Sequence, residues 1–168
     1  MENWIFDLKK EKNKKIKKEF WLLQKFTPLW LIKLQNKDLI RELRDALLTI
    51  NWGFIIEIEW IETEKIWNNI VATWKINKDD LPWFDFVLLD ECNVNIEDYI
   101  KNGVTPIVKN DCHLASILKQ YNPLKNEWNS FLYEDFNKWS IFAWIIKYTE
   151  NFKFPFDNKN LVKNVVSL

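Results

Sequence analysis

Short runs of apolar residues recur along the chain and alternate with stretches in which apolar and polar residues are mixed. A run that is apolar at successive positions, rather than at every second one, is typical of a strand buried on both faces of a parallel sheet. We expect such strands at residues 29–34, 54–58, 69–73, 84–89, 105–108 and 130–133.

The stretches between these runs carry apolar residues at helical spacing. The clearest helix spans residues 135–151 and places Phe136, Trp139, Ala143 and Ile146 on one face. Further helices are expected at residues 39–50, 95–102, 111–120 and 158–166, with a helical turn at 77–81.

Two aspartates stand where helix N-caps are expected, Asp38 before the first of these helices and Asp111 before the third. Residues 61–67 look like a connector. Because strands and helices alternate with short connections, the pattern predicts an α/β fold with a parallel, doubly wound sheet of five or six strands flanked by helices.

The stretch from Phe84 to Val108 contains a complete strand–helix–strand unit, and two acidic residues follow its first strand directly. These are Asp90 and Glu91. In open parallel sheets, ligands bind outside the carboxyl ends of the strands. The two carboxylates are therefore candidates for a binding or catalytic site.

The N-terminal part of the chain has a different character. Residues 1–20 contain seven lysines and four acidic residues, with little apolar periodicity. We expect residues 1–27 to form a lysine-rich arm, solvated or at most a frayed helix, and residues 28–168 to form one domain. The arm lacks the interleaved aromatic residues and arginines of a nucleic-acid-binding segment.

Charge and hydropathy exclude several functional classes. The 24 basic and 24 acidic residues balance, so no global charge favours nucleic acid or an anionic membrane as a partner. No apolar run approaches the roughly 20 residues of a membrane span, and the N-terminus lacks the apolar core of a signal peptide. We expect a cytoplasmic protein that binds neither.

The chain has two cysteines, Cys92 and Cys112, which are 20 positions apart. Without a second pair they fit neither a zinc site nor a disulfide framework. We expect reduced thiols that pack as small apolar groups, with no metal and no cofactor.

Tryptophan and glycine occur in abnormal numbers, 11 and 2 respectively. A chain of this length normally has about 12 glycines, which supply positive φ at turns and helix ends. Trp60, Trp74, Trp83 and Trp128 stand at such places, where a large side chain is unfavourable. One hypothesis is that many tryptophans are glycine in the organism, from a UGA codon read as glycine. The alternative is a natural tryptophan-rich protein.

The order of several short motifs resembles the nucleotide-sugar-binding, C-terminal half of glycosyltransferases with two Rossmann domains (the GT-B fold), most closely the glycogen and starch synthase type. In that family an acidic residue at a strand end is followed, after seven residues, by a second acid on a helix, then by a glycine and a G-x-P-x-V strand. Asp90 and Asp98 have this spacing, and the run from Gly103 to Val108 follows.

Two further segments carry the resemblance. The run from Lys33 to Ile40 resembles the family's diphosphate-binding segment R-L-x-x-Q-K-G-x-D-L-L, and the run from Asn129 to Tyr133 resembles its T-G-F-L-F strand. Reading Trp60, Trp74, Trp83 and Trp128 as glycine brings the chain nearer to the family's motifs. The resemblance covers residues 28–166 and implies a single Rossmann-like domain.

The resemblance implies a role for each candidate residue. Lys33 and Lys37 would neutralise the diphosphate leaving group, where negative charge develops. Asp90 and Glu91 would bind hydroxyls of the donor sugar, and Asp98 the ribose hydroxyls. The candidates near the nucleotide phosphates are Gly103, Asp111, Cys112 and His113.

The chain departs from the family in several positions. Cys112 and His113 replace a glycine pair that allows close approach to the donor, and Asp replaces Glu at both acidic positions. Lys33 and Lys37 are one residue closer than in the family, and Lys33 replaces an arginine that could form a bidentate contact.

Two functions remain open. The first is the donor-binding domain of a glycosyltransferase that moves hexose from a UDP- or ADP-sugar, acting as a fragment or with a separately encoded acceptor-binding domain. The second is a catalytically inactive, degenerate module that keeps nucleotide-sugar affinity. A Rossmann-like domain for another nucleotide is a third possibility, since many activities share this architecture.

Overall fold

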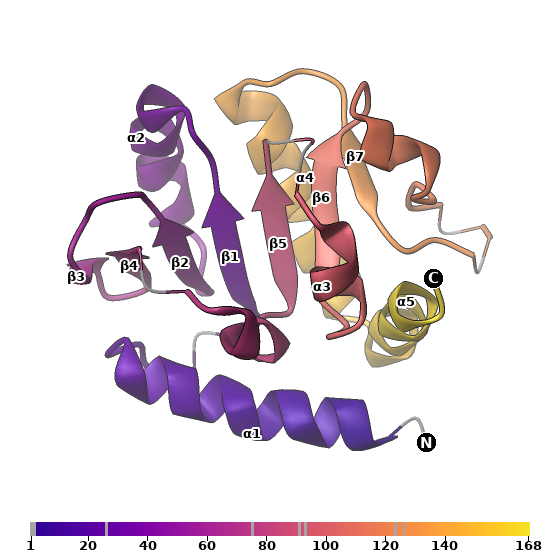
Figure 1. Ribbon diagram of the computed structural model, residues 1–168, viewed down its shortest axis with the longest axis horizontal. Coiled ribbons are helices and arrows are strands. Elements are labelled where there is room, and N and C mark those ends of the chain that lie inside the picture. Colours follow the sequence, from indigo (N-terminus) through magenta and orange to yellow (C-terminus); the bar gives the residue numbers. More distant parts are fainter. Residues whose placement is uncertain are drawn as a thin grey trace.

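The computed structural model describes residues 3–25, 27–74, 76–90, 92, 94–122, 124–125 and 127–168. Its centre is a twisted sheet of seven strands in the order β3-β4-β2-β1-β5-β6-β7 (Figure 1). The strands are β1 (Leu29–Lys33), β2 (Gly53–Glu57), β3 (Glu64–Trp67), β4 (Ile70–Thr73), β5 (Phe86–Leu89), β6 (Thr105–Lys109) and β7 (Phe131–Tyr133). All neighbouring strands pair parallel except β3 and β4.

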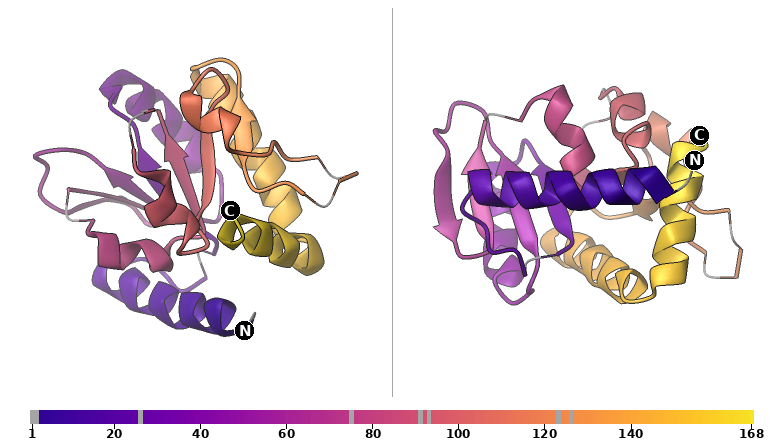
Figure 2. Two further views of the ribbon diagram at one scale, coloured as in Figure 1. Left: turned by 45° about the vertical axis from the view of Figure 1, so that its right-hand side comes forward. Right: turned by 90° about the horizontal axis from the view of Figure 1, so that it is seen from below.

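Helices cover both faces and one end of the sheet. They are α1 (Asn3–Glu19), α2 (Lys37–Leu47), α3 (Ile96–Ile100), α4 (Lys138–Phe152) and α5 (Pro155–Val166), with short 3-10 turns η1 (Lys78–Trp83) and η2 (His113–Ser116). Helices α2 and α4 lie on one face and α3 on the other, whereas α1 crosses beneath the amino ends of the strands (Figures 1 and 2). The architecture is the doubly wound α/β sheet expected from the sequence.

Local structure differs from expectation in three places. The connector at residues 61–67 contains β3, an antiparallel edge strand, so the described sheet has seven strands rather than five or six. The helix expected at residues 111–120 is only the four-residue turn η2, whose N-cap position is Cys112, not Asp111. Asn36 caps α2 in place of Asp38, because its side chain accepts from the amides of Asp38 and Leu39.

A row of aromatic side chains forms the core between the sheet and α4. Trp30 on β1 lies in register with Phe54 on β2 and Phe86 on β5, so the three side chains share one face. The ring centroid of Trp30 is 6.2 Å from that of Phe54 and 4.7 Å from that of Phe86. Tyr148 of α4 packs on Phe86 at 3.7 Å and meets Trp30 edge-on at 5.8 Å. This packing fixes α4 against the three central strands.

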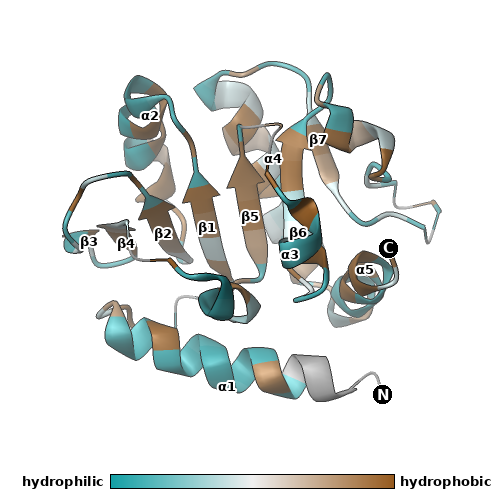
Figure 3. Cartoon of the chain, viewed as in Figure 1, coloured by the Kyte–Doolittle hydropathy of each residue, from teal (hydrophilic) through white to brown (hydrophobic). Residues whose placement is uncertain are grey.

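The lysine-rich N-terminal segment is a helix packed on the domain rather than a solvated arm. Most of α1 is hydrophilic (Figure 3). Ile16 within the helix and Phe20 directly after it nevertheless belong to the buried core. Three polar residues on the same side of the helix are also buried, Lys9, Asn13 and Lys17. Polar side chains, and not only apolar ones, therefore hold this helix beneath the sheet.

The polar contacts of α1 converge on the start of β5. Asn13 donates through Nδ2 to the carbonyl of Trp83 (2.9 Å) and to Oδ2 of Asp85 (3.4 Å), and Lys9 donates through Nζ to the carbonyl of Phe84. Asp85 also accepts from the backbone amide of Leu29 at 2.8 Å, which links the start of β1 to the residue just before β5. Burial lowers the pKa of Lys9 to about 8, although the charge of Asp85 opposes this shift.

The backbone separates the tryptophans into different groups. Trp21 and Trp60 have positive φ, 55° and 66°, and Trp60 is 93% exposed. Glycine is the residue that normally adopts a left-handed backbone conformation, and tryptophan rarely does so. The exposed side chain of Trp60 makes few contacts that could offset this cost. Trp30, in contrast, is completely buried in the core. These two positions support the glycine hypothesis, whereas Trp30 has a packing role.

We predict that Trp60→Gly stabilises the protein by about 1–2 kcal/mol, the usual cost of a left-handed conformation in a residue with a Cβ. Urea unfolding of the chain with Trp60 and of the variant measures this difference. Trp74→Gly is the matched control, because Trp74 is also exposed but has no positive φ. Equal effects of the two substitutions would contradict the backbone explanation.

The buried lysine Lys9 predicts an unusual dependence of stability on pH. Its pKa is about 8 in the folded protein and 10.5 in an unfolded chain. Between these values the unfolded state binds more protons than the folded state, so the free energy of unfolding rises with pH. We expect an increase of about 2 kcal/mol between pH 7.5 and pH 9.5. Urea titrations of the wild type and Lys9→Met measure this contribution as the difference between their profiles, because burial also lowers the pKa of Lys17 to about 8 and Lys17 is present in both proteins. Two parallel profiles would refute the contribution of Lys9.

Candidate functional site

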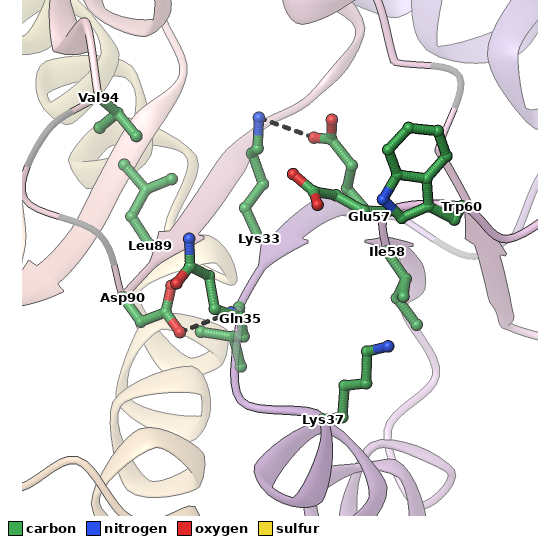
Figure 4. A pocket seen from close by; sticks show the side chains of 11 residues that line it. Lys33, Gln35, Lys37, Glu57, Ile58, Trp60, Leu89, Asp90 and Val94 are labelled. Carbon is green, nitrogen blue, oxygen red and sulfur yellow. Dashed lines mark hydrogen bonds and ion pairs between the residues drawn. The ribbon is translucent and has the colours of Figure 1, made fainter.

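A cavity of about 420 Å³ opens at the carboxyl ends of β1, β2 and β5 (Figure 4). Its volume lies in the range of small-ligand sites. The residues around it come from these three strand ends and the loops that follow them. They are Lys33, Leu34, Gln35, Lys37, Glu57, Ile58, Glu59, Trp60, Leu89, Asp90 and Val94.

The topology of the sheet explains why the cavity lies there. From β1 the chain continues through α2 to β2 on one side, whereas β5 pairs on the other side and leads away toward β6 and β7. The two crossovers leave in opposite directions, so the loops after β1 and β5 diverge. This is the topological switch point at which open α/β sheets bind ligands.

Lys33 occupies one wall of the cavity and is held by an acidic neighbour. Its Nζ lies 2.8 Å from Oε2 of Glu57, the residue beside it on β2. Burial disfavours the charged ammonium, but hydrogen bonds and charge attraction from Glu57 and Tyr99 outweigh this effect and raise the pKa of Lys33. Lys33 therefore remains a cation, with much of its charge balanced by Glu57.

Lys37 provides a second cation on the opposite wall. It is the first residue of α2, it is exposed, and it makes no ion pair within the described chain. Lys37 is the first residue of α2, so the positive end of the helix dipole lies at the edge of the cavity, and the side chain of Asn36 already accepts from the amides of Asp38 and Leu39. The cavity thus combines a cationic side chain with a helix N-terminus, a combination that favours an anion.

Asp90 lies at the carboxyl end of β5, as predicted, and lines the cavity. Its Oδ2 accepts from the backbone amide of Gln35 at 2.7 Å, which ties the loop after β5 to the loop after β1 (Figure 4). Nearby, the hydroxyl of Tyr133 donates to the carbonyl of Leu89 at 3.0 Å. Burial, with a contribution from the charge of Asp90, raises the pKa of Tyr133. Asp90 is therefore both a wall of the cavity and a link between its loops.

The structure does not bring all the predicted site residues together. Asp98 lies on α3 outside the cavity lining, and its Oδ2 is 2.6 Å from Nζ of Lys78, on the turn that leads into β5. Gly103 has a φ of 63° and forms the turn between α3 and the amino end of β6, at the other end of the sheet. This positive φ explains why a glycine stands at the position, since glycine adopts such a conformation without steric cost.

The residues after β6 are also outside the cavity lining. Asp111 is exposed and lies 2.5 Å from Lys109, and His113 is exposed at the start of η2. Cys112 is buried. Glu91, the remaining predicted residue, lies outside the described residues. Of the predicted set, Lys33, Lys37 and Asp90 share the cavity.

Sequence reasoning missed three polar lining residues, Gln35, Glu57 and Glu59. A signal was present, because Glu57 lies near the end of the run at residues 54–58 and Glu59 follows it directly, as Asp90 follows the run at residues 84–89. The same rule about strand ends, applied to every strand, would have included them.

The two cysteines form a disulfide, which corrects the expectation of reduced thiols. Cys92 follows β5 and Cys112 follows β6, and these strands are parallel neighbours, so their carboxyl ends meet although the residues are 20 positions apart. The two Cα atoms are 5.4 Å apart. Spacing alone could not reveal the pair, because it depends on the register between the strands.

Comparison with known proteins identifies the fold. No protein-family profile and no curated protein sequence matches the chain. Among solved structures, the catalytic domain of starch synthase IV from Arabidopsis thaliana, bound to ADP and acarbose, matches 95% of the chain with a TM-score of 0.72 at 15% identity. The glycotransferase of kitacinnamycin matches 86% with a TM-score of 0.52 at 11% identity.

The chain spans 39% and 40% of the lengths of these two structures. It therefore has the fold of one Rossmann-like half of a GT-B glycosyltransferase, which confirms the fold that the sequence resemblance implied. Within the described chain, no helix is long and apolar enough to cross a membrane, and no group of three or more His, Cys, Asp or Glu side chains could hold a metal ion.

We predict that reduction of the disulfide lowers the free energy of unfolding by about 3 kcal/mol, the chain-entropy value for a closed loop of this length. Urea unfolding with and without a phosphine reductant measures the change. The double variant Cys92→Ser, Cys112→Ser is the control and should be insensitive to the reductant. A wild type of unchanged stability under reduction would contradict the link.

Proposed function

We propose that this chain is the donor-binding domain of a glycosyltransferase that transfers hexose from a UDP- or ADP-sugar. The observation that carries the proposal is a cavity at the topological switch point of a GT-B half, with a cationic wall that suits a diphosphate. The solved starch synthase structure contains ADP, which is a ligand of this chemical class.

Lys37 and the N-terminus of α2 are the proposed contacts of the diphosphate. Lys37 is exposed to the cavity and has no acidic partner among the described residues, so its charge is available to a ligand. As the glycosidic bond breaks, negative charge grows on the leaving diphosphate, and a fixed cation stabilises that charge. Lys33 contributes less, since Glu57 already balances it.

The acidic residues have a separate proposed role. Asp90, which lines the cavity, is proposed to accept hydrogen bonds from hydroxyls of the donor sugar. The carboxylate of Glu57 would keep Lys33 in place rather than contact the ligand. Asp98 is assigned no ribose contact in this scheme, because Lys78 holds its carboxylate elsewhere.

Transfer to an acceptor would require a second domain. The chain corresponds to about two-fifths of the starch synthase structure, and in a two-Rossmann enzyme the reaction takes place between the halves. The proposed partner is an acceptor-binding domain, covalently attached or separately encoded. The chain alone is expected to bind a donor without transferring its sugar to a glucan primer.

A catalytically inactive nucleotide-sugar-binding module is the alternative. The ion pair that occupies Lys33 and the bulky Cys112 and His113 at the family's glycine positions favour it. Both functions require nucleotide binding, and they differ in turnover once an acceptor domain is supplied.

We predict that UDP or ADP binds the wild-type chain and that Lys37→Ala weakens binding about tenfold, the effect of losing one charge-assisted contact. Isothermal titration calorimetry with each nucleotide and its glucose ester measures the affinity. Arg41→Ala is the matched control, because Arg41 lies one turn further along α2, outside the lining of this cavity.

Three outcomes are informative. Binding that is weakened about tenfold in Lys37→Ala and unchanged in Arg41→Ala supports the donor site. Absence of binding at millimolar nucleotide would refute it. Glucosyl transfer by the isolated chain with UDP-glucose or ADP-glucose and a glucan primer would refute the need for a second domain.

A further inference from the structure

The face that α1 turns toward the sheet is cationic, which is unusual for a buried helix face. Lys9, Asn13 and Lys17 recur every four residues and are 6%, 8% and 2% exposed. Lysine is almost never buried to this extent unless it is paired. An ordinary amphipathic helix would place leucine or isoleucine at these positions.

The described residues provide these lysines with too few acceptors. Lys17 donates through Nζ to Oγ1 of Thr27 (2.5 Å) and to the carbonyl of Gln24 (3.3 Å), and Lys9 donates to the carbonyl of Phe84. Two ammonium groups carry six N–H donors, and these bonds use three. Three buried donors thus have no acceptor within the described chain.

The charges are also unbalanced. Asp85 is the one carboxylate that interacts with both lysines, and its oxygen already accepts from Leu29 and Asn13. Two further lysines, Lys10 and Lys14, line the same region from the exposed side of the helix. Among the described residues that line this region, four lysines therefore accompany one carboxylate.

These residues border a second cavity, at the opposite end of the sheet from the donor site. Its volume is about 450 Å³. Phe86, Phe152 and Val162 form an apolar wall, and Asn158 of α5 adds an amide whose Oδ1 has no hydrogen-bond partner among the described residues. The lysines of α1, the carboxylate of Asp85 and the amide of Asn158 therefore line one cavity.

We propose that this cavity between α1, α5 and the start of β5 binds a phosphate group, free or as a small phosphate ester. A phosphate offers several strong acceptor oxygens and two negative charges, which match the unfilled N–H donors and the excess of cations. The apolar wall would contact the organic part of an ester. The site is separate from the donor cavity, which lies at the carboxyl ends of the strands.

A purely structural role for the lysines does not account for the same facts. If α1 needed only to be held in place, apolar side chains at the three positions would do so without burying charge, often at equal or greater stability. The cavity and the three unfilled donors would remain unexplained.

The test is the binding of inorganic phosphate to the full chain. Binding is measured by the shift in melting temperature at constant ionic strength, with sodium chloride as the reference salt. We expect 10 mM phosphate to raise the melting temperature by about 5 °C. Lys17→Met should abolish this shift. Lys18→Met is the matched control, because Lys18 is the exposed neighbour of Lys17 on the same helix and its substitution removes the same charge.

Two further arms keep the outcome decisive. Lys37→Ala, in the donor cavity, should leave the phosphate shift unchanged, whereas a shift lost in this variant would assign phosphate to the donor site. If Lys17→Met does not fold, the double variant Lys10→Met, Lys14→Met at the exposed rim should at least halve the shift. Equal shifts in phosphate and chloride would overturn the proposal.

Glycerol 3-phosphate distinguishes the two sources of the phosphate group. An ester that binds at least tenfold more tightly than inorganic phosphate, and loses this advantage in Phe152→Ala, indicates an esterified ligand. Equal affinity of the two indicates free phosphate, and both results support the site. Absence of a Lys17-dependent shift with either compound would refute it.

Discussion

The parallel pairing of β1 with β2 on one side and β5 on the other is the constraint on which the structure depends. It places β1 in the middle of the sheet and sends the two crossovers in opposite directions. The loops after β1 and β5 are then the ones that separate, and the cavity forms between them. The Asp90 bond to the amide of Gln35 joins these two loops.

The same strand controls the other end of the sheet. Asp85, just before β5, accepts from the amide of Leu29 at the start of β1, and the lysines of α1 gather around this carboxylate. Each end of the β1–β5 pair is thus fixed by an aspartate that accepts from a backbone amide on the β1 side. Asp90 fixes the end that faces the proposed donor, and Asp85 fixes the end that faces α1.

The sequence predicted most of the fold because the central strands are buried on both faces and so read as continuous apolar runs. It failed where tertiary contacts override local pattern. In β3, Glu64 and Lys65 lack an apolar signature, because an edge strand needs only a partner on one side. In α1 the polar buried face hid the helix, since it is held in part by hydrogen bonds to the backbone carbonyls of Trp83 and Phe84, which no periodicity reveals. Of the candidate site, strand ends were predictable, whereas the position of Asp98 depended on an ion pair with a distant turn.

The antiparallel strand β3 has an effect beyond the chain's own architecture. It closes a sheet whose edge would otherwise be β4, with four fully buried apolar or small residues and a row of backbone groups ready to pair. Glu64 and Lys65 are exposed, and the register shifts between Lys65 and Trp67. Charged side chains and an irregular backbone on a terminal strand oppose the addition of a strand from another molecule. The exposed charges and the register shift of β3 therefore make the edge of this sheet a poor template for pairing with another chain.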